Sequence, residues 1–190
     1  MKTVFFDVDT QLDFLCPAGA LYVPGGEKLL PALGALTRCA GARKIQIIST
    51  ADAHTENDPE FQAWKPHCVV GTVGQQKAAA TLLPNARVLG TGSDPSAPQL
   101  IVEKQKLDAF SNPNLGPLLK AMAADRYVLY GVVTELCVRC AAIGLLETGA
   151  RVELVTDAIK SLSTGDERAF IEQFQGQRGV LTAAAAVLNE

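Results

Sequence analysis

Short apolar runs rich in β-branched residues alternate along the chain with segments of helical periodicity. The runs lie at Val4–Val8, Ile45–Ser49, Leu100–Val102, Tyr127–Val133 and Val152–Val155, with another at Gly179–Thr182. Most of them are apolar at nearly every position, which is typical of parallel strands covered by helices on both faces. The pattern therefore predicts a mostly parallel sheet of about six strands.

The segments between the runs repeat their apolar residues at the spacing of an amphipathic helix. They are Glu27–Ala40, Pro113–Ala124, Thr134–Glu147 and Thr164–Phe174. Gly149 is a candidate C-terminal cap of the third segment, and Thr164 with Glu167 has the spacing of a capping box. Alternating strands and helices predict an α/β fold, a three-layer αβα doubly wound sheet, in a single domain that spans residues 1–190.

Composition and charge narrow the classes of function. The chain has 190 residues, a net charge of −3 and no basic stripe, which argues against binding to nucleic acid or an acidic membrane. No run approaches the roughly 18 apolar residues that a membrane span needs, and the first residues lack a signal-peptide pattern. We expect a cytoplasmic protein whose five cysteines are thiols.

Ionisable or nucleophilic side chains follow each of the first four apolar runs. In chain order they are Asp7 and Asp9, Asp52 and His54, Glu103 and Lys104, and Cys137. Ligands of doubly wound sheets bind outside the carboxyl ends of the strands, so we expect these side chains to share one edge. Alternation along the first run also predicts that Asp7 and Asp9 lie on the same face.

Cys137 has a physical reason to be reactive. Thr134 is a suitable N-cap, which places Cys137 in the first turn of a helix. There the helix dipole and the free N–H groups favour a thiolate, and the same groups could bind a developing oxyanion. A buried structural thiol is the competing interpretation.

The two histidines of the chain, His54 and His67, both fall in the irregular stretch Asp52–Ser96. Asp52 and His54 alternate in an extended segment, so both side chains can face one point. One carboxylate and two imidazoles suit Zn, Fe or Mn and leave positions open for water and substrate. Glu60 is a candidate additional ligand. The alternative to a metal site is that both histidines are ordinary surface residues.

Two motifs suggest other chemistry. Phe6–Thr10 resembles the first motif of haloacid-dehalogenase-type phosphatases, in which the first aspartate, here Asp7, is the nucleophile. The later acidic pair of those enzymes is matched only poorly by Gly165–Glu167. Cys137 and Cys140 form a CxxC that would allow a reversible disulfide, although it follows the fourth run rather than an early strand.

Taken in order, the motifs resemble the nicotinamidase branch of the isochorismatase-like cysteine hydrolases. The resemblance covers nearly the whole chain and includes segments similar to D-x-Q-x-D-F, G-A-L-x-V-P and G-V-x-T-x-x-C-V. The matching segments are Asp9–Phe14, Gly19–Pro24, Asp52–His54, Trp64–Thr72, Lys104–Phe110 and Gly131–Val138.

The resemblance implies a role for each candidate residue. Asp9, Lys104 and Cys137 would form the catalytic triad of a thioester mechanism. The peptide bond between Val132 and Val133 would be cis and would turn one N–H group toward the oxyanion. The implied ligands of a divalent metal that contacts the pyridine nitrogen of nicotinamide are Asp52, His54 and His67; no organic cofactor is expected.

Departures from the family pattern bear on the substrate. Ala53 stands where many nicotinamidases have tryptophan, and Leu107 and Asp108 replace an aromatic residue and a serine. Phe14 and Trp64 remain as candidate walls for a planar ring, with Leu107 beside them.

The sequence thus predicts an amidohydrolase that converts nicotinamide into nicotinate and ammonia. A family hydrolase with another substrate, such as isochorismate or a carbamoyl amide, is one alternative. A non-enzymatic, redox-responsive relative that uses Cys137 and Cys140 is another. The expected partner is a small amide rather than nucleic acid or membrane, and the resemblance implies a homo-oligomer, either a dimer or a tetramer.

Overall fold

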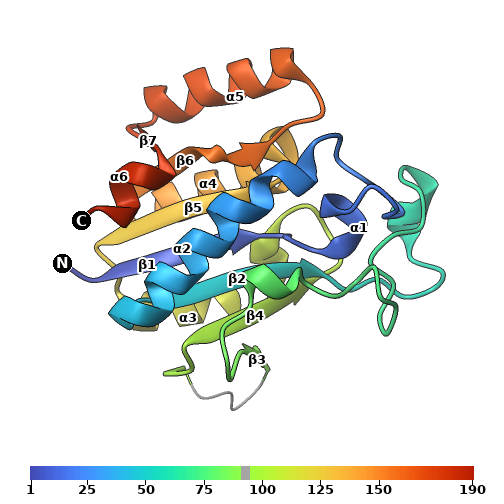
Figure 1. The fold of residues 1–190 in the computed structure, drawn as a ribbon, viewed down its shortest axis with the longest axis horizontal. Helices are drawn as coiled ribbons and strands as arrows, with labels where there is room; N and C mark the ends of the chain where they lie inside the picture. The colour runs from blue at the N-terminus through green and yellow to red at the C-terminus, as the bar shows by residue number, and fades with distance from the viewer. Residues whose placement is uncertain (91–94) are drawn as a thin grey trace.

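The protein is described by a computed structural model over residues 1–90 and 95–190. Within these residues seven strands form one sheet in the order β3-β4-β2-β1-β5-β6-β7 (Figure 1). Every neighbouring pair is parallel. The strands are β1 Thr3–Val8, β2 Gln46–Asp52, β3 Arg87–Val88, β4 Gln99–Lys104, β5 Arg126–Val132, β6 Arg151–Lys160 and β7 Val180–Thr182.

This sheet confirms the predicted α/β fold, with seven strands rather than about six. The additional strand is β3, whose two residues are too few to show a periodic pattern. It lies in the stretch where the sequence shows little periodicity, of which residues 91–94 are outside the described part.

Helices cover both faces of the sheet. The α-helices are α1 Leu12–Leu15, α2 Leu30–Arg43, α3 Leu115–Met122, α4 Arg139–Glu147, α5 Thr164–Gly176 and α6 Ala184–Leu188. Short 3₁₀ turns are η1 Gly26–Leu29, η2 Pro59–Gln62, η3 Ala79–Thr81 and η4 Ala109–Ser111, and η5 Thr134–Val138 is a π-helical turn. In Figure 1, α2 and α6 lie in front of the sheet, with α3 and α4 behind it.

The apolar side chains form one core on each side of the sheet. Val4 and Phe6 of β1 pack in the cluster that contains residues of α3, α4 and α5. Phe5, between them, packs in the cluster that contains residues of α1, α2 and α6. Each fully buried phenylalanine contributes about 2–3 kcal/mol, which explains why β1 is apolar at successive positions.

Two helix N-termini differ from the sequence expectation, and one C-terminus agrees with it. The segment predicted as one helix from residue 134 begins with η5, whose N-cap is Val133, and the Thr134 hydroxyl makes no hydrogen bond. Helix α5 is capped by Ser163, whose side chain accepts a hydrogen bond from the Asp166 N–H. Gly149 follows α4 with a φ of 81°, as predicted for a C-terminal glycine.

Among the described residues, no helix is long and apolar enough to cross a membrane. Both termini lie at the left in Figure 1, whereas α1 and the segment that follows β2 lie at the opposite end of the sheet. This opposite end is formed by the carboxyl ends of β1, β2, β4 and β5, where the candidate residues were expected.

Candidate active site

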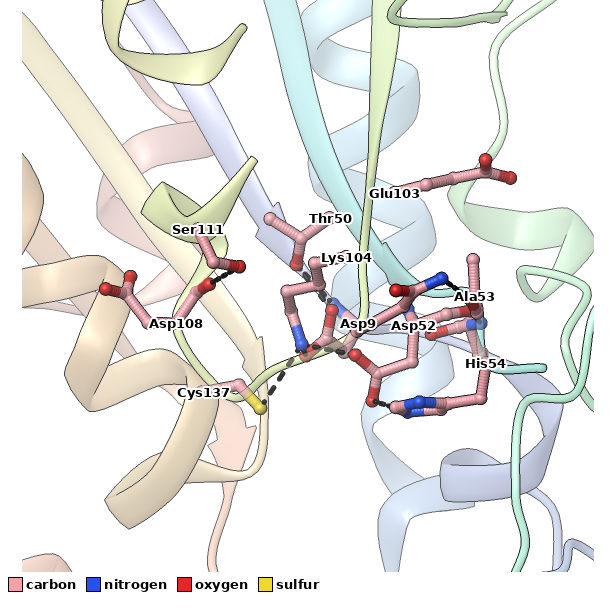
Figure 2. A network of polar contacts seen from close by, with 12 residues as sticks. Asp9, Thr50, Asp52, Ala53, His54, Glu103, Lys104, Asp108, Ser111 and Cys137 are labelled. Atoms are coloured by element: carbon pink, nitrogen blue, oxygen red, sulfur yellow. Dashed lines mark hydrogen bonds and ion pairs between the residues drawn. The ribbon is translucent and has the colours of Figure 1, made fainter. Parts of the chain in front are cut away.

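Lys104 lies at the centre of the polar cluster at the carboxyl edge of the sheet. Its ammonium group is 2.9 Å from Asp9 Oδ2, contacts Asp52 Oδ1, and donates to Cys137 Sγ at 3.6 Å (Figure 2). Asp52 and Lys104 are brought together by the sheet, because they are partners in the register of β2 and β4. The expected convergence of strand ends therefore occurs. Glu103, by contrast, points away from the cluster in Figure 2.

The charges of this cluster depend on one another. Burial by itself lowers the pKa of Lys104, but the neighbouring Asp9 and Asp52 carboxylates raise it well above its ordinary value. Burial likewise opposes ionisation of Asp52, yet the Lys104 ammonium and the two neighbouring imidazoles hold the Asp52 pKa below its usual range. Lys104 is therefore a permanent cation and Asp52 a permanent carboxylate at neutral pH.

The Asp9 carboxylate differs from that of Asp52 in its hydrogen bonds and in the direction of its pKa shift. Its backbone leaves β1 with a φ of 49°, and its Oδ1 accepts a hydrogen bond from the Thr50 hydroxyl at 2.5 Å. Burial raises the pKa of Asp9, and the charge of Lys104 opposes that rise. A carboxylate whose pKa is raised toward neutrality is better suited to exchange protons during a reaction.

Cys137 is buried, with 6 % of its surface exposed, in the first turns after β5. Burial raises the pKa of its thiol well above the ordinary value; Lys104 opposes this rise, and Asp9 and Asp52 add to it. Burial of the thiol therefore opposes the thiolate that its helix position was expected to favour. The thiol needs a base, and the Asp9 carboxylate contacts the same Lys104 ammonium as the thiol does.

Asp52, His54 and His67 are buried and form a candidate metal centre. One ligand atom from each lies within 4.8 Å of the other two. The Nε2 atoms of His54 and His67 are 3.8 Å and 3.7 Å from Asp52 Oδ2. These separations are too long for hydrogen bonds but suit three atoms that each lie about 2 Å from a shared cation. The donor set therefore fits a divalent metal ion.

Outer contacts orient both imidazoles. His54 Nδ1 lies 3.1 Å from a carboxylate oxygen of Asp58, and His67 Nδ1 lies 2.7 Å from the Lys65 carbonyl oxygen. Such partners of the second ring nitrogen direct Nε2 toward a metal. Strand-like pairing of His54 with Val69 brings the two histidines together.

A cavity of about 50 Å³ connects the candidate metal ligands Asp52 and His67 with Cys137. Its lining residues are Asp9, Phe14, Leu21, Tyr22, Val23, Asp52, Glu60, Trp64, His67, Leu107, Val132, Val133, Leu136, Cys137 and Leu162. The candidate walls Phe14, Trp64 and Leu107 all belong to it, and the Phe14 ring lies 5.5 Å from that of His67. Glu60 lines the same cavity, outside the compact three-ligand set. The peptide bond between Val132 and Val133 is cis.

Asp7 does not share the environment of Asp9, so the expectation of a common face is wrong. Its carboxylate pairs with Lys77 at 3.0 Å and accepts hydrogen bonds from Thr10 and Ser49. The two aspartates diverge because Asp9 has left the strand, with a positive φ. A fully buried, ion-paired Asp7 also leaves no access for the phosphate ester that the phosphatase motif would require.

The departures from the family pattern have local explanations. Ala53 is buried beside the cluster rather than in the cavity, and its N–H donates to the Lys104 carbonyl at 2.8 Å. Asp108 caps the turn η4, where its side chain accepts from the Phe110 N–H. A serine could make the same capping bond. Leu107 is thus the departure that changes the cavity wall.

Some residues of the site carry no recognisable signal in the sequence. Thr50 contacts Asp9 because β2 lies beside β1, which the register of parallel strands could have indicated. Leu162 and Tyr22 reach the cavity from connecting segments, for which no pattern gives a position. All five cysteines are free thiols, as expected.

The chain is similar to known proteins over most of its length. The Isochorismatase domain family matches residues 3–186. A maleamate amidohydrolase of Pseudomonas putida is 26 % identical over 163 residues, covering 83 % of this chain and 72 % of the relative. A nicotinamidase/pyrazinamidase of Mycobacterium tuberculosis is 26 % identical over 185 residues, covering 88 % and 91 %.

Solved structures extend the similarity to three dimensions. A pyrazinamidase of Pyrococcus horikoshii in complex with zinc superimposes with a TM-score of 0.83 at 28 % identity, covering 96 % of this chain and 99 % of that one. This likeness agrees with a divalent metal at the centre formed by Asp52, His54 and His67.

Proposed function

The chain belongs to the isochorismatase family and is an amidohydrolase, and on this basis we propose that it hydrolyses nicotinamide to nicotinate and ammonia. The observation that carries the proposal is that Asp52 and His67, two of the three candidate metal ligands, line the same small cavity as Cys137. A planar amide with a ring nitrogen can occupy both ends of such a cavity at once.

The proposed first half-reaction forms a thioester. Asp9 accepts the proton of the Cys137 thiol, and the sulfur attacks the amide carbonyl carbon while the carbonyl electron pair moves to oxygen. The backbone N–H groups of Val133 and Cys137 stabilise the resulting oxyanion. When the C–N bond breaks, Asp9 returns its proton to the nitrogen, and ammonia leaves.

The second half-reaction releases the acid. Asp9 accepts a proton from water as the water oxygen attacks the thioester carbonyl. Breaking the C–S bond restores the sulfur, which regains the proton, and nicotinate departs. Throughout, Lys104 keeps the neighbouring carboxylate in place and offsets negative charge.

The residues that would hold the metal are Asp52, His54 and His67. When bound there, a divalent cation would supply a Lewis acid for the ring nitrogen and so fix the orientation of the amide. Zn, Fe and Mn all suit this donor set.

The charges around the cavity favour a neutral amide over an anionic one. Asp9, Asp52 and Glu60 line the cavity, and among the described residues no arginine or lysine does. A carboxylate-bearing substrate such as maleamate would find no lysine or arginine among these lining residues, and the charge of the nearby Lys104 is already shared by Asp9 and Asp52. Nicotinamide is neutral and presents an apolar ring to Phe14 and Trp64.

The test is ammonia release by the metal-loaded and the chelator-treated protein from nicotinamide, benzamide and maleamate. We expect the highest kcat/KM for nicotinamide, and a larger loss on chelation for nicotinamide than for benzamide, which lacks the ring nitrogen. Cys137→Ala should abolish turnover, whereas the matched variant Cys140→Ala should retain it. Equal rates on nicotinamide and benzamide, or a preference for maleamate, would overturn the substrate assignment.

A further inference from the structure

Leu162 is a large apolar side chain at the mouth of the active-site cavity. It lines the same cavity as Cys137 and Trp64, yet 49 % of its surface is exposed. It belongs to the short connection between β6 and α5, far in sequence from the motifs that supply the catalytic residues. The exposed part of this side chain would be covered favourably by an apolar ring bound in the cavity.

Glu135 ties this connection to the turn that carries the nucleophile. Its Oε1 accepts hydrogen bonds from the backbone N–H groups of Leu162, at 2.9 Å, and of Ser163, at 3.0 Å. Glu135 itself belongs to η5, two residues before Cys137. Hydrogen bonds to an ionised carboxylate are among the stronger ones in proteins, so the two backbone positions are well defined.

The residues on either side of Leu162 are fixed as well. The Ser161 hydroxyl donates to Glu167 Oε2 at 2.8 Å, and the Ser163 hydroxyl accepts from the Asp166 N–H at 3.3 Å. Both serines are therefore used to anchor the connection to α5. Leu162 is left as the side chain that this connection contributes to the cavity.

We propose that Leu162 is a specificity-determining residue that covers the ring of the bound amide, and that Glu135 is a positioning residue that acts through Leu162. The proposal rests on the proposed function in that it assumes hydrolysis in this cavity. It adds a substrate class: amides whose carbonyl is attached to a flat apolar ring should gain affinity from Leu162, which lines the same cavity as Phe14 and Trp64.

The test combines steady-state kinetics with hydrogen exchange. Leu162→Ala removes apolar contact made equally to substrate and transition state, so KM for nicotinamide should rise about tenfold with kcat nearly unchanged. Glu135→Ala should raise KM similarly. The KM of the double variant should exceed that of the more affected single variant by no more than about twofold, because both changes remove the same contact to the substrate. Glu135→Gln keeps an oxygen acceptor and should retain a KM within about threefold of wild type.

Hydrogen exchange gives a readout that needs no substrate. The Leu162 and Ser163 amides should exchange faster in Glu135→Ala than in wild type, and Glu135→Gln should restore most of the protection. Glu172→Ala, on the exposed part of α5, is the matched control and should change neither exchange nor KM. Thermal melts of every variant identify those that fail to fold.

Four results would overturn the proposal. They are an unchanged KM in Leu162→Ala, a loss of kcat alone in Glu135→Ala, multiplied effects in the double variant, and a control variant that behaves like Glu135→Ala. If the wild-type protein prefers another amide to nicotinamide, the proposed substrate fails, and the same kinetics with that amide still test the roles of Leu162 and Glu135.

Discussion

Replacing Lys104 with methionine removes the cation that neutralises two buried carboxylates. The Lys104 side chain is fully buried, 2.9 Å from Asp9 and in contact with Asp52. Breaking a buried ion pair by removing one partner costs about 3–5 kcal/mol, because the remaining charge is left without compensation. We therefore expect metal-free Lys104→Met to lose about 3–5 kcal/mol of unfolding free energy at pH 7.5.

The pH dependence of this loss follows from the signs of the pKa shifts. Lys104 lowers the pKa of both Asp9 and Asp52, so its removal raises both values in the folded protein. The variant should then take up protons on folding. The difference in stability from wild type is greatest above the raised pKa values of the variant and shrinks as the pH falls through them.

The assay is urea denaturation of wild type and Lys104→Met at several pH values, together with ammonia release. Protonated Asp9 cannot accept the thiol proton, so kcat should fall by about 10²–10⁴ at neutral pH. Lys106→Met, an exposed lysine two residues away, is the matched control and should change stability by less than about 0.5 kcal/mol. A Lys104→Met protein that keeps wild-type stability and turnover would refute the reasoning.

Two further changes test other parts of the site. Lys77→Met leaves the buried Asp7 carboxylate with only its Thr10 and Ser49 hydrogen bonds and should cost about 3 kcal/mol of unfolding free energy, measured by urea denaturation. Combining it with Asp7→Asn removes the unpaired charge and should recover much of that loss. A double variant as unstable as the single one would contradict this. Asp58→Asn weakens the acceptor beside His54 Nδ1 and should lower zinc affinity about 10–100-fold in competition with a chromogenic chelator, a result that unchanged affinity would rule out.

The positions of the main catalytic candidates follow from the sequence because parallel strands share one carboxyl edge. Asp52 and Lys104 end the neighbouring strands β2 and β4, and Cys137 follows β5, which is separated from β2 by β1 alone. Short apolar runs therefore gave not only the α/β fold but also the place of the site. The residue types then identified the chemistry that this place could hold.

Other features depend on tertiary structure that no local pattern records. Asp9 leaves the strand with a positive φ, so simple alternation wrongly predicts that Asp7 and Asp9 share a face. The raised pKa of Cys137 is due mainly to burial, which overrides its favourable place in a helical turn. Leu162 reaches the cavity from a short connection, and elements as short as β3 are below the length at which periodicity is visible.

The central claim is that Cys137 attacks a small amide and carries the acyl group. Acid quench during turnover of the amide that the wild-type protein hydrolyses fastest, followed by peptide mass spectrometry, tests it directly. The account predicts one acyl group on the peptide that contains Cys137, attached to that sulfur, and none in Asp9→Asn, where the base is missing. Continued turnover by Cys137→Ala, or an acyl group attached to another residue, would contradict it.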